Sequence, residues 1–189
     1  MTNITVIYDA SVLYPAPVRD LLLQLACSDL CRAHWTSEIH DEWIRNLLAN
    51  RPDLAPDQLQ RTRELMDAGV RDCLVENYRA LIPSLDLPDP NDRHVLAAAI
   101  VAQASLIITC NLRDFPRRNL KIHGIEAQHP DEFIGNLINL APARVHSVVA
   151  TIRARLRNPP ISPSEYIDTL EQHSLTKTAA LLQSFEDQI

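Results

Sequence analysis

The sequence predicts an α/β domain with a largely parallel sheet, followed by an all-helical C-terminal appendage. Short runs of β-branched and aliphatic residues alternate with helix-like segments up to about residue 139. From about residue 141 the pattern changes to helix after helix, interrupted by Pro159, Pro160 and Pro163. We therefore expect an α/β domain over residues 1–139 and a helical extension over residues 140–189.

The first half of the α/β domain begins with the apolar run ITVIY at 4–8, which predicts a buried strand. A helical stretch follows Pro15 and Pro17, and LCRAHW at 30–35 is a candidate second strand. Thr36 and Ser37 are candidate N-caps for a helix running to about Ala49. We also expect a helix at 56–68 and a strand at 73–75.

The second half contains the most helical run of the chain, HVLAAAIVAQA, which the turn-like LPDPND precedes. The apolar run LIIT at 106–109 predicts another strand, and a further apolar, β-like piece spans about 120–125. The segment PDEFIGNLINL at 130–140 predicts a helix. Strands that alternate with helices in this way favour a parallel sheet.

Composition excludes several classes of protein. Only three glycines occur, so there is no Gly-rich phosphate loop, and the four cysteines form no CxxC pair of a zinc site. The formal net charge of −6 argues against a general nucleic-acid coat, which would be basic. No apolar run approaches the roughly 20 residues that span a bilayer, and no basic segment of a secretion signal begins the chain. We expect a cytoplasmic protein with no membrane contact.

Four acidic residues occupy positions where an α/β fold presents side chains to one cleft. Asp9 follows the first strand, Asp114 follows the strand at 106–109, Asp92 lies at the start of the AAAI helix and Glu42 lies in the helix after the second strand. Ligands of open parallel sheets bind beyond the carboxyl ends of the strands. Taken singly, each residue has a structural explanation as a helix cap, a turn residue or a solvated flank.

Taken together, the four carboxylates predict a metal site. Clustered carboxylates repel one another, and a divalent cation supplies the missing counter-charge. Hard oxygen ligands without cysteine suit Mg²⁺ or Mn²⁺. Such an ion lowers the pKa of bound water and stabilises charge on a phosphoryl oxygen, which is the chemistry of phosphodiester hydrolysis.

The ordered set YDASVL, HDEW, PNDRHVLAAAI and TCNLRDFP resembles the PIN-domain nucleases, especially the VapC-like toxins of type II toxin–antitoxin systems. The resemblance covers roughly residues 4–135. It implies a PIN-like parallel sheet flanked by helices and a Mg²⁺- or Mn²⁺-dependent endoribonuclease that cuts RNA. It also implies a cognate antitoxin protein as partner and a homodimer.

Carried over residue by residue, the resemblance makes the four acidic positions the catalytic, metal-binding carboxylates Asp9, Glu42, Asp92 and Asp114. Ser11 takes the place of a small polar residue that supports the first Asp. Asn111 matches the N of TxNxxDF, where some relatives carry an acidic residue, so either Asn111 or Asp114 faces the metal. Asp89 could approach the site, although a helix-capping role is simpler.

Basic residues and histidines near these motifs have two explanations each. Arg113, Arg117 and Arg118 either grip the RNA backbone or form a solvated loop. His40 and His94 neighbour acidic residues and could ligate a metal or hold a phosphate, although hydrogen-bonded or surface histidines are commoner.

Three other functions compete with the toxin hypothesis. A phosphatase that forms an aspartyl-phosphate usually needs DxD after the first strand, and this chain has Ser11 at the third position. A PIN-like module that only binds is disfavoured because all four acidic positions are filled. A PIN nuclease outside any toxin–antitoxin pair stays open, since toxins of this type usually end near residue 135–140 and this chain continues.

Overall fold

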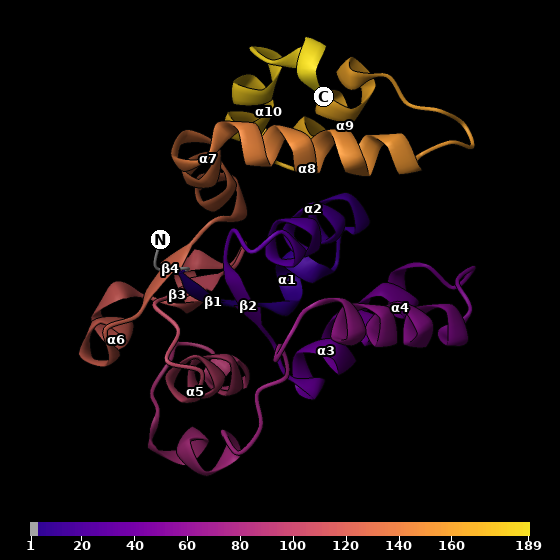
Figure 1. Ribbon diagram of the computed structural model, residues 1–189. Helices are drawn as coiled ribbons and strands as arrows, with labels where there is room; N and C mark the ends of the chain where they lie inside the picture. Colours follow the sequence, from indigo (N-terminus) through magenta and orange to yellow (C-terminus); the bar gives the residue numbers. More distant parts are fainter. Residues whose placement is uncertain (1–3) are drawn as a thin grey trace.

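A parallel four-stranded sheet lies at the centre of the α/β part in this computed structural model, which describes residues 4–189 (Figure 1). Its strands are β1 (Thr5–Tyr8), β2 (Arg32–His34), β3 (Leu106–Ile108) and β4 (Glu126–Gln128). All pairings are parallel, and the order across the sheet is β2-β1-β3-β4. The second strand, β2, is therefore added on one side of β1, and the third and fourth strands, β3 and β4, are added on the opposite side. That reversal creates a crevice at the carboxyl ends of β1 and β3.

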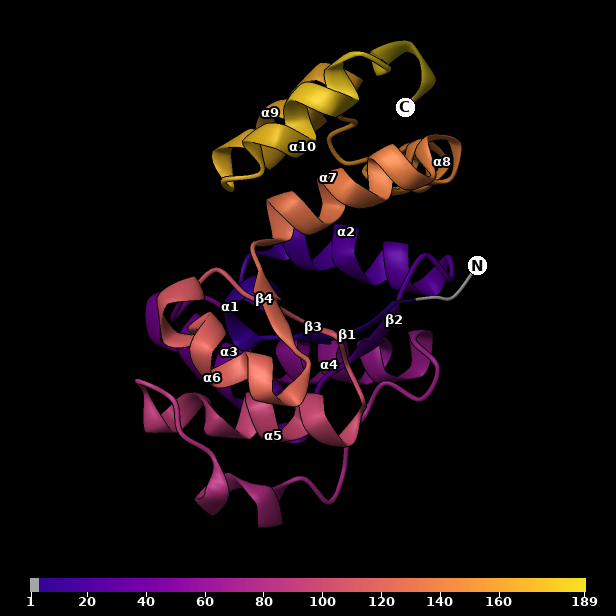
Figure 2. The same ribbon diagram turned by 90° about the vertical axis from the view of Figure 1, so that its left-hand side faces the viewer.

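Helices cover both faces of this sheet (Figure 2). The short α1 (Ala10–Leu13) and α2 (Ala16–Cys27) lie on the side that faces the C-terminal helices. The other side is covered by α5 (Arg93–Val101), which contacts β1 and β3, with α3 (Ser37–Asn50) and α4 (Pro56–Gly69) beside it. Ile7, Tyr8, Ile107 and Ile108 are fully buried between these layers. Both faces are apolar, as a parallel sheet with two helical layers requires.

Short single-turn elements connect these helices and strands. Four 3-10 turns occur in the α/β part, and the short helix α6 (Arg117–Leu120) lies next to β4. The turns are η1 (Arg79–Ser84), η2 (Pro90–Asp92), η3 (Leu112–Asp114) and η4 (Lys121–His123). Two of them, η2 and η3, carry acidic residues of the motifs, so much of the candidate site stands on tight turns at helix and strand ends.

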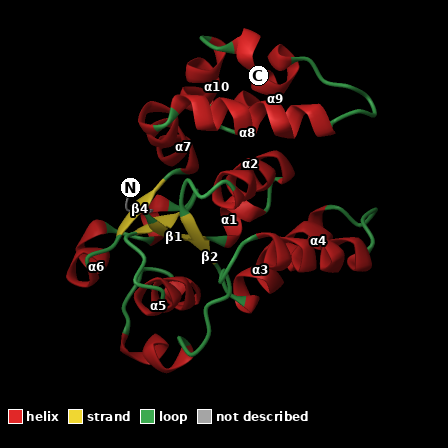
Figure 3. Cartoon of the chain, in the orientation of Figure 1, coloured by secondary structure: helices red, strands yellow, loops and turns green. Residues whose placement is uncertain are grey.

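The helical extension is built from α7 (Pro130–Leu140), α8 (Pro142–Arg155), α9 (Pro163–Gln172) and α10 (Thr176–Gln183), with a final turn η5 (Glu186–Gln188) (Figure 3). Helix α7 packs against α8 and α10, while α8 packs on α2. Asp131 of α7 accepts hydrogen bonds from the backbone N–H groups of Lys177 and Thr178 at 2.9 and 2.7 Å, which caps the start of α10. The predicted boundary after residue 139 stays a prediction, since α7 packs with the helices that follow it.

Most predicted elements are confirmed, including the fold class. Helix α3 begins after Thr36, whose hydroxyl caps it by accepting from the Ile39 N–H at 3.1 Å. Two predicted strands are wrong. At 120–125 the chain forms the turn η4 and ends it at Gly124 with φ of 69°, and the strand β4 follows at the polar residues 126–128. At 73–75 there is only a parallel bridge between Trp35 and Leu74.

Within residues 4–189, no helix is both long enough and apolar enough to cross a membrane.

Candidate metal centre

The candidate centre lies at the crevice where β1 and β3 end side by side. Asp9 is the first residue after β1, and its backbone N–H donates to the Ile108 carbonyl of β3 at 3.1 Å. Thr109 is the first residue after β3. The parallel register of the two strands therefore brings residues about a hundred positions apart to the same edge of the sheet.

Asp9 is held by two hydroxyl groups. Its Oδ2 accepts from the Ser11 hydroxyl at 2.6 Å and from the Thr109 hydroxyl at 2.8 Å. Ser11 N–H also approaches Oδ2, at 3.4 Å, in the N-cap geometry of α1. Every hydrogen bond to this carboxylate from the described residues reaches Oδ2. The Oδ1 atom is thus left without a protein donor, although Asp9 is only 3% exposed.

The two hydroxyls are themselves fixed by the backbone of the loop after β3. Ser11 Oγ accepts from the Cys110 N–H at 3.0 Å, and Thr109 Oγ1 accepts from the Asn111 N–H at 2.9 Å. Hydroxyl and backbone thus form one rigid support under Asp9. This arrangement places Ser11 where the resemblance expects a supporting residue. Thr109 was not singled out from the sequence, although its place as the T of TCN gave a signal.

The electrostatics of Asp92 show that the acidic residues lie within reach of one another. Burial raises the pKa of Asp92 to about 7, with further increases caused by the charges of Asp9, Asp89, Asp114 and Glu42. The pKa of Asp9 is also raised, chiefly by burial, with a smaller contribution from Glu42 that opposes the hydrogen bonds of Ser11 and Thr109. A like-charge cluster with elevated pKa values lacks a counter-charge.

Asp89 has the capping role that its position predicts. Its side chain accepts from the Asn91 N–H at 2.8 Å, and Pro90 occupies the first position of η2. Asp92 ends that turn and immediately precedes α5. The negative charge of Asp89 nevertheless acts on Asp92, so this residue belongs to the electrostatic cluster as well as to the cap.

Glu42 reaches the centre from α3 and meets α5 there. Its Oε2 lies 3.6 Å from Nε2 of His94, which is an ion-pair distance only if the imidazole is protonated. His94 is buried, and its Nδ1 has no hydrogen-bond partner among the described residues. His94 is therefore a neighbour of the acidic cluster, as its sequence position allowed.

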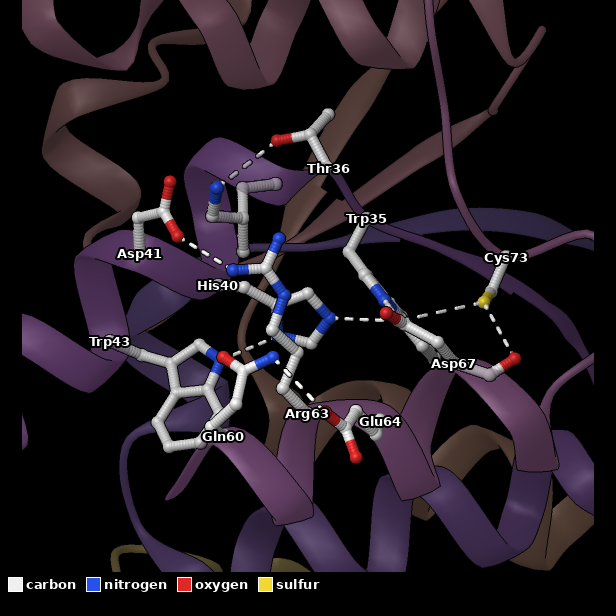
Figure 4. A network of polar contacts seen from close by, with 11 residues as sticks. Trp35, Thr36, His40, Asp41, Trp43, Gln60, Arg63, Glu64, Asp67 and Cys73 are labelled. Atoms are coloured by element: carbon white, nitrogen blue, oxygen red, sulfur yellow. Dashed lines mark hydrogen bonds and ion pairs between the residues drawn. The ribbon is translucent and has the colours of Figure 1, made fainter. Parts of the chain in front are cut away.

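His40 does not belong to this centre. It is fully buried between α3 and α4, and both ring nitrogens have protein partners (Figure 4). Its Nε2 lies 2.9 Å from Oδ1 of Asp67, and its Nδ1 accepts from the Trp43 indole at 3.0 Å. The Trp35 indole donates to the same Asp67 oxygen at 2.8 Å. This network joins α3 to α4 and so fixes the helix that carries Glu42.

The donor chemistry of the centre fits a hard divalent cation. It offers carboxylate oxygens, carries an uncompensated negative charge, and presents no cysteine ligand set. In the described part of the chain, however, no group of three or more His, Cys, Asp or Glu side chains is gathered closely enough to hold an ion. The carboxylates are thus electrostatically coupled but spatially open.

The loop after β3 places the remaining predicted residues around this crevice. Asn111 immediately precedes the turn η3 as its N-cap residue, and Asp114 ends the turn. The charge of Asp114 raises the pKa of Asp92, so this carboxylate lies within electrostatic reach of the centre. Which of Asn111 and Asp114 faces the metal stays a prediction. Arg113 is largely exposed, with Nε 3.8 Å from Asp114 Oδ1. Arg117 and Arg118 are exposed on α6.

Comparison with protein families gives two matches that together cover most of the chain. Residues 5–113 match the family model described as PIN domain, and residues 130–184 match the one described as VapC50 C-terminal domain. The first match runs from β1 into the turn η3, so it contains β1, β2 and β3 but not β4. The second begins at the first residue of α7.

Comparison with individual proteins gives one curated relative, "Putative ribonuclease VapC50" of Mycobacterium tuberculosis. It is 38% identical over 79 residues, which is 42% of this chain and 47% of the relative. The match thus spans about half the length of that protein. No solved structure matches.

Proposed function

The chain belongs to the PIN-domain family, and from this premise we propose that it is a metal-dependent endoribonuclease that hydrolyses RNA phosphodiester bonds. The observation that carries the proposal is the coupled acidic cluster at the ends of β1 and β3, in which the pKa of Asp92 is raised to about 7. The name of the curated relative, which includes the word ribonuclease, supports the choice of RNA as substrate.

Asp9, Glu42, Asp92 and Asp114 would hold Mg²⁺ or Mn²⁺, with Asp9 offering the oxygen that its supporting hydroxyls leave free. When bound, the cation would supply the positive charge that activates water and stabilises the phosphoryl oxygens during hydrolysis. Ser11 and Thr109 orient the Asp9 carboxylate. The pKa of Asp92, about 7 without metal, would fall once a cation compensates the negative charge of the cluster. Arg113, Arg117 and Arg118 would attract the RNA backbone beside the cluster.

The test is cleavage of a panel of cellular RNAs by the purified protein, with Mg²⁺ or Mn²⁺ against a chelator. We expect cleavage only with metal, and a loss of at least about a hundredfold in Asp9→Asn. Asp168→Asn changes an exposed carboxylate on α9 and should leave the rate unchanged. Cleavage that survives in both the chelator and Asp9→Asn would refute the metal-dependent mechanism.

A PIN-like module that only binds is the second candidate function. It is favoured by the open spacing of the carboxylates, since no three of them are gathered at ion-holding distance within residues 4–189. Isothermal titration of the protein with Mn²⁺ separates the two functions. Absence of both metal binding and cleavage by folded protein would leave the binding module as the better proposal.

We further propose that the protein is the cytoplasmic toxin of a toxin–antitoxin pair and forms a homodimer. The VapC50 descriptions of the matched family and relative support a toxin role. A small neighbouring gene whose product copurifies with this chain and blocks cleavage would support the pairing. If the mass in solution at micromolar concentration were that of one chain, 21.3 kDa, the homodimer would be rejected.

A further inference from the structure

A pocket of about 640 Å³ lies between the α/β part and the helical extension. It is lined by residues of α2 and α4 and by residues from α8 to α9, and it contains none of the four acidic residues of the candidate centre. Its volume lies within the range of about 300–1,000 Å³ that is typical of small-molecule sites. The proposed nuclease chemistry gives this pocket no role.

The walls of the pocket are mainly apolar. They are formed by aliphatic and thioether side chains, namely Leu23, Leu65, Met66, Ile152, Leu156 and Ile161. Leu65 and Leu156 remain 57% and 37% exposed, so the pocket opens to solvent. Water in contact with a concave apolar surface is readily displaced by an apolar ligand.

One polar group of the pocket is buried without a partner. Tyr166 of α9 lines the pocket and is only 3% exposed, and its hydroxyl has no hydrogen-bond partner among the described residues. Burial, and then the charge of Asp20, raises the pKa of Tyr166, so the hydroxyl keeps its proton and can donate it. Buried hydroxyls are normally satisfied, which makes an acceptor on a ligand the expected partner.

The charged residues that line the pocket are already compensated, so none of them is available to pair with a charged ligand. Arg19 is already engaged, since its guanidinium lies 4.7 Å from the Trp43 ring and donates to the Leu13 carbonyl at 2.5 Å. The two remaining charged residues, Asp20 and Arg155, have opposite signs and act on each other. A charged group that entered would lose its hydration without meeting an unmatched counter-charge.

We propose that this pocket binds a neutral, mostly apolar small molecule whose carbonyl oxygen accepts a hydrogen bond from the Tyr166 hydroxyl. Such a ligand lies between α2 and α4 on one side and α8 and α9 on the other. It contacts both parts of the chain at once, and its carbonyl oxygen reaches the covered Tyr166 hydroxyl once the flexible side chains beside that hydroxyl move aside.

The test uses the full-length protein and prodan, a neutral naphthalene with a single carbonyl group whose emission reports hydrogen bonding to that carbonyl. We expect saturable binding at micromolar concentration, whereas the anionic probe 1-anilinonaphthalene-8-sulfonate should bind much more weakly. Tyr166→Phe should weaken prodan binding about 3- to 10-fold and shift its emission further to the blue, because one hydrogen bond is lost. Tyr14→Phe, outside the pocket lining, should change neither value.

A second variant tests the location of the site without touching the hydroxyl. Leu65 lies at the exposed rim, so Leu65→Trp should fold and should reduce prodan binding at least about tenfold by filling the pocket mouth. Unsaturable binding, equal binding of the anionic probe, or insensitivity to both Tyr166→Phe and Leu65→Trp would each overturn the proposal.

Discussion

Helix α3 contributes to two polar clusters that differ in how their groups are matched. On one side His40 lies in a network in which the polar atoms of His40, Asp67, Trp35 and Trp43 find partners at 2.8–3.0 Å. On the other side Glu42 belongs to a group of carboxylates whose negative charges raise the pKa values of Asp9 and Asp92. His40 and Glu42, the members that α3 contributes to the two clusters, lie only two residues apart in the sequence. His40 is fully buried, whereas Glu42 is partly exposed.

The comparison distinguishes polar groups that stabilise the fold from polar groups that do not stabilise it and therefore need a functional explanation. A buried network whose donors and acceptors are matched fixes a unique packing. Unmatched like charges oppose folding, so their presence favours a ligand that compensates them. The four predictions below test this contrast and run from the largest expected effect to the smallest.

Breaking the matched network should cost the most stability. Asp67→Ala removes the acceptor of both the His40 Nε2–H and the Trp35 indole, so the free energy of unfolding should fall by about 3 kcal/mol. Glu64→Ala, at an exposed site on the same helix, is the matched control and should cost less than about 0.5 kcal/mol. Urea denaturation measures both. Equal losses in the two variants would show that the network contributes nothing specific.

Removing the Thr109 hydroxyl that supports Asp9 should lower the free energy of unfolding by less than the loss of the matched network does. Thr109→Val keeps the shape of the fully buried side chain but deletes the hydroxyl that donates to Asp9 and accepts from the Asn111 N–H. We expect a loss of about 2 kcal/mol in the free energy of unfolding, because a hydrogen bond to a charged group disappears. RNA cleavage should also fall. A Thr109→Ser variant should restore both, and failure of that rescue would assign the effect to packing instead.

Neutralising a member of the acidic cluster should stabilise the protein. The pKa of Asp92 is raised to about 7, so the folded state holds a proton that the unfolded state releases near pH 4. As pH rises from about 4 through 7, the folded state of the natural protein loses stability, while Asp92→Asn does not. At pH 8 without metal we expect the variant to be more stable by about 1 kcal/mol, allowing for solvent screening of a half-exposed group.

The comparison at pH 5 is the internal control for this effect, because only about a third of the loss between pH 4 and 7 has occurred there, so the advantage of Asn should be clearly smaller than at pH 8. Denaturation curves at the two pH values decide it. An advantage of the same size at both would place its origin outside the titration of Asp92.

Adding metal should restore stability that the repulsion between the carboxylates removes, and this effect is the smallest of the four. At pH 8, Mn²⁺ at three times its dissociation constant should stabilise the protein by about 0.8 kcal/mol, or about 2–3 °C in Tm for a chain of this size. Asp92→Asn should show a smaller shift, and Asp67→Asn, outside the acidic cluster, should retain it. Thermal unfolding with and without a chelator provides the readout, and an undiminished shift in Asp92→Asn would count against its role as a ligand.

The sequence predicts where the acidic residues lie on the fold better than it predicts the minor elements of the fold, while their roles in the site stay predictions. Asp9, Asp92 and Asp114 could be placed because each follows a strand or precedes a helix with a clear apolar pattern. The parallel arrangement then brings strand ends together. Glu42 has the weaker sequence signal, since at its place beside the apolar stripe of α3 it has an ordinary explanation as a solvated flank.

Other features depend on contacts between residues far apart in sequence. The strand β4 is a polar edge strand, EAQ, so hydrophobic periodicity cannot detect it. The hydroxyl of Thr109 acquires its role only because β3 lies next to β1. His40 borders acidic residues in the sequence, yet Asp67, its partner, comes from the next helix. The pocket at Tyr166 is formed by helices separated by about a hundred residues.

Helix α2 packs between the sheet and α8, and this position constrains how the sequences of such chains can change in evolution. One side of α2 covers the sheet, and α8 packs against α2 as well. The Arg144 side chain of α8 donates a hydrogen bond to the carbonyl of Ser28, which directly follows α2. A descendant that lost the C-terminal helices would uncover aliphatic surface on α2 that now meets α8. Gain or loss of the extension in evolution therefore requires matched replacements in α2, so these two distant segments should change together.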